Sequence, residues 1–174
     1  MSIPVSKLFD EAEIAARVET LAGEIVRSLG GEFVVIGVLK GSFVFLADLV
    51  RALARAGATP GVEFMRLASY GQKQESSGVV QLLGDVPRDF EGRAVLLVDD
   101  IVDTGLSMAY GKRLLTERHA SRVRTCALLD KPSRRQVEAA IDFVGFEIPD
   151  VFVVGYGIDY AEQYRGLRDI RVLV

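Results

Sequence analysis

Residues 94–107 read Ala-Val-Leu-Leu-Val-Asp-Asp-Ile-Val-Asp-Thr-Gly-Leu-Ser. The first five residues of this stretch are all apolar, which is typical of a strand buried on both faces of a parallel sheet. Asp99, Asp100 and Asp103 follow, and a helical stretch to about Arg118 comes after them. Strand, polar loop and helix in that order form the repeating unit of an α/β fold.

The same unit recurs on both sides of this stretch. Other buried strands are predicted at residues 33–39, 123–129 and 152–156, with further strands at 62–70 and 79–83 and an edge strand at 171–174. Helices are predicted at residues 10–29, where apolar residues recur at spacings of three and four and Asp10 and Glu13 form a capping box, and from Ser42 to Ala56. The order predicts a doubly wound, mainly parallel twisted sheet flanked by helices.

Composition excludes several classes of protein. The chain has 174 residues, of which 49% are hydrophobic and 26% charged, so we expect one folded domain over residues 1–174 rather than a disordered chain. The net charge of −3 gives no basic field for nucleic acid. The longest apolar run, residues 33–39, is too short to cross a membrane. A single cysteine excludes internal disulfides, and the acidic N-terminal region is unlike a targeting segment, so we expect a cytoplasmic protein.

Polar residues at the end of the central strand predict a ligand site, because α/β sheets bind ligands at the carboxyl ends of their strands. Three carboxylates within five residues repel one another, and a cation or a polyhydroxyl ligand would relieve that repulsion. Residues 104–107, Thr-Gly-Leu-Ser, then enter a helix and predict a small phosphate cradle. Together these features indicate a sugar phosphate; the alternative is a capped turn with solvated aspartates.

Residues 98–105 resemble the phosphoribosyl-pyrophosphate motif of the type I phosphoribosyltransferases. Residues 39–42 resemble the pyrophosphate loop of that family, and Ser69, Tyr70 and the polar residues 71–78 resemble its mobile catalytic loop. Residues 129–131 and 149–160 resemble the purine-binding part of the hypoxanthine-guanine phosphoribosyltransferases. The similarity runs from about residue 34 to residue 170.

The resemblance implies a type I phosphoribosyltransferase fold with a small hood over the active site. It also implies purine salvage, in which Mg²⁺-dependent transfer of 5-phosphoribosyl from phosphoribosyl pyrophosphate to hypoxanthine or guanine gives IMP or GMP and pyrophosphate. Neither nucleic acid nor membrane is an expected partner, whereas association into a homodimer or homotetramer is common in the family.

The resemblance assigns Asp103 proton transfer with the purine, and positioning of the base without proton transfer is the alternative. Asp99 and Asp100 would hold the ribose hydroxyls directly or through Mg²⁺, although many relatives have Glu in place of Asp99. Crowding by these two carboxylates would raise the pKa of Asp103. The expected phosphoribosyl-binding residues are Asp99, Asp100, Ile101, Val102, Asp103, Thr104, Gly105, Leu106 and Ser107, and the expected metal-binding residues are Asp99, Asp100 and Asp159.

The resemblance also assigns pyrophosphate and purine contacts. Pyrophosphate would contact Lys40, Gly41, Ser69, Tyr70 and Arg165, with a cis peptide before Lys40; purine would contact Lys131, Val151, Phe152, Val153 and Asp159. Taken alone, Arg165 fits a surface ion pair with Glu162 or Asp169, Lys131 a solvated loop lysine, and Phe152 a core aromatic. The Lys131 amino group would select a 6-oxopurine over adenine.

Two other functions compete with this one. A xanthine-preferring transferase would share these motifs, because the contacts to the purine 2-position are backbone carbonyls that the sequence does not place. A regulator that binds phosphoribosyl pyrophosphate without turnover would keep the phosphate cradle. Such a regulator usually carries a nucleic-acid-binding segment, for which 174 residues at net charge −3 leave no room.

Overall fold

The computed structural model describes residues 5–70 and 79–173. Its centre is a six-stranded sheet in the order β4-β3-β2-β5-β6-β7, in which every pair is parallel except the antiparallel pair β3 and β4. The strands are β2 (Val34–Leu39), β3 (Gly61–Tyr70), β4 (Val79–Leu83), β5 (Ala94–Val102), β6 (Arg122–Asp130) and β7 (Phe143–Glu147). The mainly parallel sheet predicted from the sequence is therefore confirmed.

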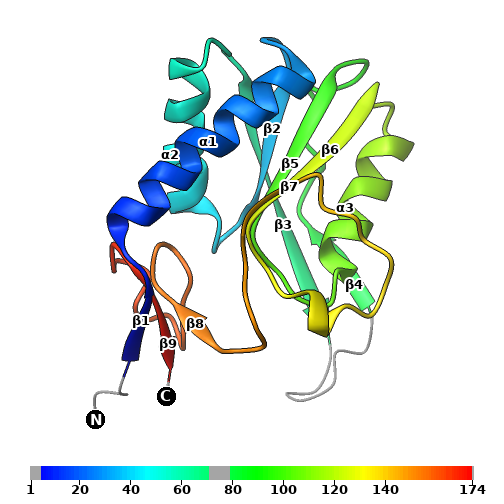
Figure 1. Cartoon of the computed structure of the whole chain (residues 1–174). Helices are drawn as coiled ribbons and strands as arrows, with labels where there is room; N and C mark the ends of the chain where they lie inside the picture. Colours follow the sequence, from blue (N-terminus) through cyan, green and yellow to red (C-terminus); the bar gives the residue numbers. More distant parts are fainter. Residues whose placement is uncertain (1–4, 71–78, 174) are drawn as a thin grey trace.

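Helices cover both faces of the sheet. α1 (Glu11–Leu29) and α2 (Phe43–Arg55) lie on one face, and α3 (Leu106–Glu117) lies on the other (Figure 1). Alternate residues of β5 divide between the two sides: Leu96 and Val98 belong to the core beneath α1 and α2, and Val95 and Leu97 to the core beneath α3. This division is why the strand is apolar at every position.

The predicted N-terminal helix is confirmed together with its cap. The Asp10 side chain accepts a hydrogen bond from the Glu13 amide at 2.8 Å, and the Glu13 carboxylate accepts one from the Asp10 amide at 2.8 Å. Gly30 ends the helix with a φ of 79°. The predicted apolar face is the buried one, since Ile14 and Leu21 are 1% and 0% exposed.

The central strand is longer than predicted. We predicted that it ends at Val98, but β5 continues to Val102 and so contains Asp99 and Asp100. The pairing explains the difference: β5 parts from β2 after Val98 yet stays paired with β6 as far as Asp130. The last four residues of β5 therefore have a free edge on the β2 side.

The C-terminal third departs from the predicted order. We predicted a buried strand of the main sheet at residues 152–156; the place beside β6 is taken instead by β7, which we did not predict. β8 (Val153–Val154) has only two residues, because Gly155, Tyr156 and Gly157 all have positive φ and end the extended conformation.

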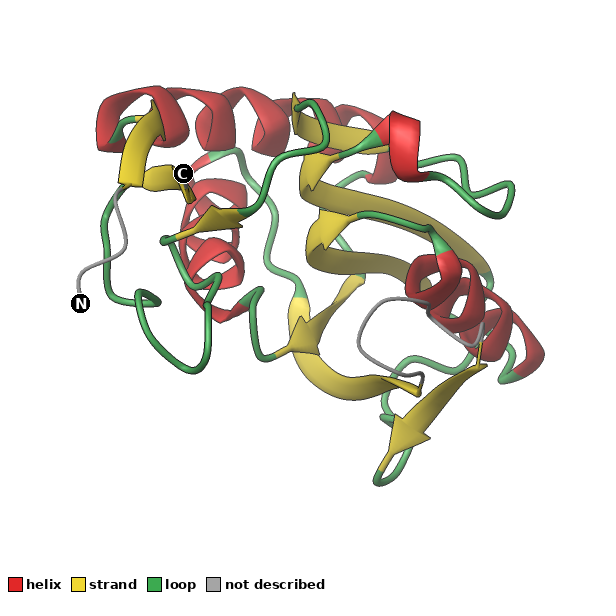
Figure 2. Cartoon of the chain, turned by 90° about the horizontal axis from the view of Figure 1, so that it is seen from below, coloured by secondary structure: helices red, strands yellow, loops and turns green. Residues whose placement is uncertain are grey.

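β8 belongs to a separate three-stranded antiparallel sheet in the order β1-β9-β8, with β1 (Val5–Phe9) and β9 (Ile170–Leu173). β9, predicted as an edge strand, is its middle strand. This small sheet lies at the carboxyl end of the main sheet, below α1 and α2, where the hood is predicted (Figures 1 and 2). Within residues 5–70 and 79–173, no helix is long and apolar enough to cross a membrane.

Candidate active site

The end of β5 holds two neighbouring carboxylates. Asp99 is 9% exposed, and one of its carboxylate oxygens accepts a hydrogen bond from the Asp100 amide at 2.9 Å. Burial raises the pKa of the Asp99 carboxyl, and the charge of Asp100 beside it raises that pKa further. Two carboxylates held this closely in a buried place favour a cation or a hydroxyl-bearing ligand as their partner.

The loop between β2 and α2 lies directly against this pair. A Cβ atom added to Gly41 would stand 2.6 Å from Cγ of Asp100, so any larger residue there would displace the Asp100 carboxylate or the loop. The peptide bond between Leu39 and Lys40 is cis, as the resemblance implies. The buried hydroxyl of Ser42 donates to the Val38 carbonyl and ties the loop back to β2.

The predicted phosphate cradle has the expected local geometry. Gly105 adopts a φ of 86° immediately before α3, and the Leu106 amide donates to Oγ1 of Thr104 at 3.3 Å. No described residue accepts a hydrogen bond from the amides of Ser107 and Met108 in the first turn of α3. These amides, at the positive end of the helix, are available to an anion.

The segment that follows β6 packs against the predicted phosphate cradle, residues 104–107, and hydrogen-bonds to it. The amides of Gln136 and Val137 donate to the Thr104 carbonyl at 2.9 and 3.4 Å. A Cβ added to Gly105 would stand 2.8 Å from Cδ of Arg135, so the segment also packs against the glycine. Glycine is therefore required at position 105 by both its φ and its neighbours.

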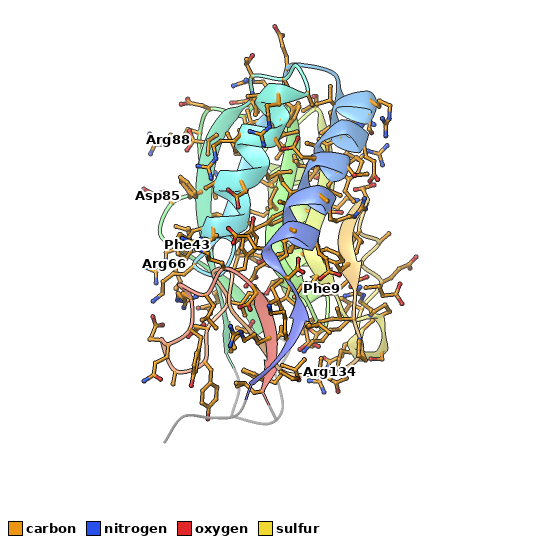
Figure 3. The ribbon with its side chains drawn as sticks, turned by 60° about the vertical axis from the view of Figure 1, so that its left-hand side comes forward. Phe9, Phe43, Arg66, Asp85, Arg88 and Arg134 are labelled. Carbon is orange, nitrogen blue, oxygen red and sulfur yellow. The ribbon has the colours of Figure 1, made fainter. Side chains whose placement is uncertain are left out.

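Asp103 lies beside a cation. Its Oδ1 accepts a hydrogen bond from Nε of Arg134 at 3.0 Å, and Nη1 of the same arginine lies 3.8 Å from Asp150. Figure 3 shows Arg134 at the same end of the molecule as the small sheet. The carboxyl whose pKa is raised by burial and by a neighbouring carboxylate is that of Asp99, which is buried next to Asp100.

Two cations meet near the loop after β2. Lys40 Nζ lies 3.0 and 3.1 Å from the two carboxylate oxygens of Glu162, and Nη2 of Arg165 lies 3.4 Å from one of them. Arg165 also pairs with Asp159 at 3.0 Å. Of the two surface pairs considered for Arg165, the one with Glu162 is present, whereas Asp169 binds Arg171 at 2.9 Å.

The residues predicted to bind purine lie at the start of the small sheet and the end of β6. Lys131 is 7% exposed, not solvated, and its amide donates to the Val102 carbonyl at 2.9 Å. Phe152 is 53% exposed rather than in the core, and its ring meets Tyr160 edge to face at 5.6 Å. Val153 is buried in β8 and Val151 is partly buried beside it. An exposed ring and a buried ammonium group are suited to stack on and to hydrogen-bond a planar, polar ligand.

The loop predicted to be catalytic is described only at its base. Ser69 is exposed near the end of β3 and pairs with Val80 of β4, and Tyr70 pairs with Val79. Residues 71–78 lie outside the described residues.

The acidic pair fits Mg²⁺ better than Asp159 does. Carboxylate oxygens are hard ligands, and Mg²⁺ is usually held by one or two carboxylates with water and ligand phosphates completing the shell. Asp99 and Asp100 supply such a pair. Both oxygens of Asp159 are engaged, one by Arg165 and one by the Glu162 amide at 2.8 Å. Within the described ranges no cluster of three or more His, Cys, Asp or Glu side chains surrounds a single point.

A cavity of about 560 Å³ lies between α1, α2 and residues 165–168, and it meets this site only at its edge, through Arg165. Its lining is largely apolar helix surface, and it contains none of the carboxylates of β5. The candidate active site is therefore the carboxyl end of the main sheet, where the β5 carboxylates lie, and not this cavity.

Sequence reasoning missed Arg134, and it considered Glu162 only as a surface partner of Arg165. Arg134 lies three residues after Lys131, and Glu162 three residues before Arg165, so both stand close to residues already singled out. The sequence does not show that the chain folds back to bring Arg134 to Asp103, 31 positions away, or Glu162 to Lys40, 122 positions away.

A parallel sheet that presents carboxylates, a phosphate cradle and two cations at one end defines a phosphoribosyl-binding class of α/β protein. The family model described as a phosphoribosyl transferase domain matches residues 4–161, so the chain is a member of that class.

The most similar proteins narrow the class. The hypoxanthine-guanine phosphoribosyltransferase of Aquifex aeolicus is 48% identical over 94% of this chain and 91% of its own length. The hypoxanthine phosphoribosyltransferase of Escherichia coli is 42% identical over 96% and 94%. A crystal structure of a hypoxanthine-guanine phosphoribosyltransferase from Bacillus anthracis superposes with a TM-score of 0.89 at 42% identity, covering 99% of this chain and 100% of that one. The chain belongs to the hypoxanthine-guanine phosphoribosyltransferase family.

Proposed function

We propose that the chain transfers the 5-phosphoribosyl group of phosphoribosyl pyrophosphate to hypoxanthine or guanine and so salvages purines. The carbon–oxygen bond to pyrophosphate breaks with its electron pair leaving on pyrophosphate. The carbon–nitrogen bond to the purine forms, and the purine's imidazole proton is released. The observation that carries this proposal is the convergence of the acidic pair, the phosphate cradle and the pair of cations at the carboxyl end of one sheet.

The end of β5 fits the ribose phosphate. The amides at the start of α3 would bind the 5′-phosphate, and Asp99 and Asp100 would bind the ribose hydroxyls, directly or through Mg²⁺. When bound, Mg²⁺ would neutralise charge on the leaving pyrophosphate. Pairing with a cation would also relieve the repulsion that raises the pKa of Asp99.

Asp103 is the candidate for the proton. Asp103 is the first residue after β5, and it contacts Arg134 of the segment after β6. Its side chain is 40% exposed, so a purine can reach it. Arg134 binds only Oδ1 of Asp103, so Oδ2 would be the oxygen that faces the ligand. We propose that Asp103 accepts the imidazole proton; simple positioning is the alternative.

Lys40 and Arg165 would bind pyrophosphate, whose charge rises as the bond to ribose breaks. Arg165 is 19% exposed, and Nη1 donates to the Gly157 carbonyl at 2.8 Å, which fixes the orientation of its guanidinium. Fixed cations aimed at a developing charge stabilise the transition state more than the ground state.

The purine would lie against the Phe152 ring with its 6-oxo group toward Lys131. A buried ammonium donor favours an oxo acceptor and meets a second donor in adenine. The contacts to the purine 2-position are backbone groups near Asp159, so a xanthine-preferring transferase is the nearest alternative.

The test is the forward reaction with Mg²⁺, phosphoribosyl pyrophosphate and each of hypoxanthine, guanine, xanthine and adenine, followed by nucleotide absorbance. We expect turnover with hypoxanthine or guanine and a kcat/KM for adenine that is lower by about 10²-fold or more. A preference for xanthine selects the alternative transferase. Tight binding of phosphoribosyl pyrophosphate without turnover of any purine indicates a regulator and overturns the proposal.

We further propose that the chain acts as one domain in the cytoplasm and associates as a homodimer or homotetramer. Exposed apolar side chains support association: Phe43 at the start of α2, labelled in Figure 3, is 45% exposed, and Phe64 on β3 is 48% exposed. Light scattering on the purified chain tests this directly.

A further inference from the structure

A carboxylate of the chain itself occupies the space between the two proposed pyrophosphate cations. Oε1 of Glu162 lies 3.0 Å from Nζ of Lys40 and 3.4 Å from Nη2 of Arg165. Oε2 lies 3.1 Å from the same lysine nitrogen. One carboxylate thus binds both cations in the way an oxygen of pyrophosphate would.

The three groups come from two separate parts of the chain. Lys40 follows β2, while Glu162 and Arg165 belong to the connection between β8 and β9. The contact between Lys40 and Glu162 spans 122 positions, so it is a tertiary contact and not a consequence of nearness in sequence. The hydrogen bond from Lys40 and its charge lower the pKa of the Glu162 carboxyl, which keeps it charged near neutral pH.

The backbone is held in an unfavourable conformation to place Glu162 there. Tyr160 and Gln163 pair across a two-residue turn, in which Ala161 and Glu162 have φ of 51° and 62°. Two positive φ values at the centre of a hairpin turn normally select Asn and Gly. Non-glycine residues kept in this region are enriched where a side chain has a function.

We propose that Glu162 is an affinity-determining residue of the pyrophosphate site, which it fills in the free protein and leaves when pyrophosphate binds. This inference rests on the proposed function, which supplies pyrophosphate as product and as part of the substrate. A ligand must displace the carboxylate from both cations, so its apparent dissociation constant is the intrinsic constant divided by the fraction of molecules in which Glu162 has left the cations. The same competition would speed the release of pyrophosphate after transfer.

The test compares pyrophosphate binding to the wild-type chain and to Glu162→Gln in the presence of Mg²⁺, by calorimetry and by inhibition of the forward reaction. Gln keeps the length of the side chain and the backbone amide that donates to Asp159, and removes only the charge. Exposed ion pairs each contribute a factor of roughly 1.5 to 5, so releasing two of them should tighten pyrophosphate binding by about 2- to 25-fold.

Two controls separate charge from other effects. Glu11→Gln removes an exposed carboxylate that faces Arg168 at 3.8 Å, and should leave pyrophosphate affinity unchanged. Ala161→Gly relaxes the same turn while keeping the Glu162 carboxylate, and should also leave the affinity unchanged.

If Glu162→Gln binds pyrophosphate as tightly as the wild-type chain or more weakly, Glu162 does not compete with pyrophosphate. Its carboxylate would then serve to position the two cations. Failure of both proteins to bind pyrophosphate at any tested concentration overturns the pyrophosphate site as well. Turnover of purine by the wild-type chain decides the proposed function separately, because that assay does not depend on the variant.

Discussion

The carboxylate of Asp100 lies against the α-carbon of Gly41, where a methyl group would stand 2.6 Å from Cγ of the aspartate and nearer still to Oδ2. This contact joins the end of β5, which carries the acidic pair, to the loop that carries Lys40. Gly157, near Arg165, approaches from the other side, and a Cβ on it would stand 2.6 Å from the Gly41 carbonyl oxygen. Three segments of the proposed site therefore meet at one glycine.

Gly41→Ala should disable the site without unfolding the chain. The added methyl group must move either Asp100 or the loop, and displacements of this size cost about 10²-fold in activity even when the catalytic groups are intact. The measurement is kcat/KM for phosphoribosyl pyrophosphate, with the melting temperature recorded beside it. Gly166→Ala is the matched control, since no atom lies within 4 Å of its added Cβ. Full activity of Gly41→Ala would mean that the contact has no part in ligand binding.

Asp103→Asn tests the proton acceptor. Asn keeps the shape and loses the basic oxygen, so we expect kcat to fall by about 10²-fold or more. Asp150→Asn removes the other, more distant partner of Arg134 and should change kcat little. An Asp103→Asn enzyme that retains most of its turnover would leave this residue only a positioning role.

The sequence predicts the part of this site that is local. Apolar runs and the capping box identify the strands and helices around Val98 and Asp10, because those patterns arise from contacts within one element or from burial on both faces of a sheet. The phosphate cradle is also local, since Gly105 and Thr104 are neighbours of the helix that they precede.

The rest depends on contacts between distant segments. The length of β5 is set by its pairing with β6 beyond Val98, and the brevity of β8 by three successive residues of positive φ. The partners of Asp103 and Lys40 depend on how later loops fold back, so the sequence identifies neither Arg134 as the partner of Asp103 nor Glu162 as the partner of Lys40. Only the structure shows that the crowded carboxylate is Asp99.

Lys131→Met tests recognition of the 6-oxo group. Met retains the buried aliphatic stem and removes the charged donor, whose hydrogen bond is worth a factor of about 10 to 100. KM for hypoxanthine should rise by that factor while KM for phosphoribosyl pyrophosphate stays unchanged. Lys112→Met, an exposed lysine of α3, serves as the control. Equal increases in both constants would show a general loss of structure rather than of purine contact.

Tyr156→Phe tests the link between α2 and the loop that carries Arg165. The buried Tyr156 hydroxyl donates to Asp48 of α2, and burial and that carboxylate raise the pKa of the phenol. Removing the hydroxyl should lower the free energy of unfolding by about 1–2 kcal/mol. The melting temperature should fall by roughly 2–8 °C. Tyr110→Phe, which removes a hydroxyl on α3 without a described hydrogen bond, should leave the melting temperature unchanged.

Asp99→Asn should stabilise the fold while reducing activity. Burial, reinforced by Asp100, raises the folded-state pKa of Asp99 above its unfolded value of about 3.9. The folded chain therefore binds this proton more tightly than the unfolded chain, so the free energy of unfolding falls as pH rises from the unfolded pKa to the folded pKa. Asn does not ionise, so the free energy of unfolding of the variant does not fall for this reason as pH rises. The variant should be the more stable protein at pH 7–8, a range typical of stability measurements, and the difference should shrink toward pH 4 and vanish below the unfolded pKa of about 3.9.

Urea denaturation from pH 4 to pH 8 measures this difference, and Asp142→Asn supplies a control of opposite sign. Burial raises the pKa of Asp142, but hydrogen bonds from Thr125 and Arg124 outweigh burial and lower it. Its removal should therefore destabilise the chain at high pH, with the difference shrinking as pH falls through the folded pKa of Asp142. If Asp99 and Asp100 bind Mg²⁺, added Mg²⁺ should stabilise the wild-type chain more than Asp99→Asn, because only the wild-type pair has two charges to neutralise. If the wild-type chain is more stable than Asp99→Asn at pH 8 without Mg²⁺, the charged Asp99 carboxylate does not destabilise the fold, and this prediction is wrong.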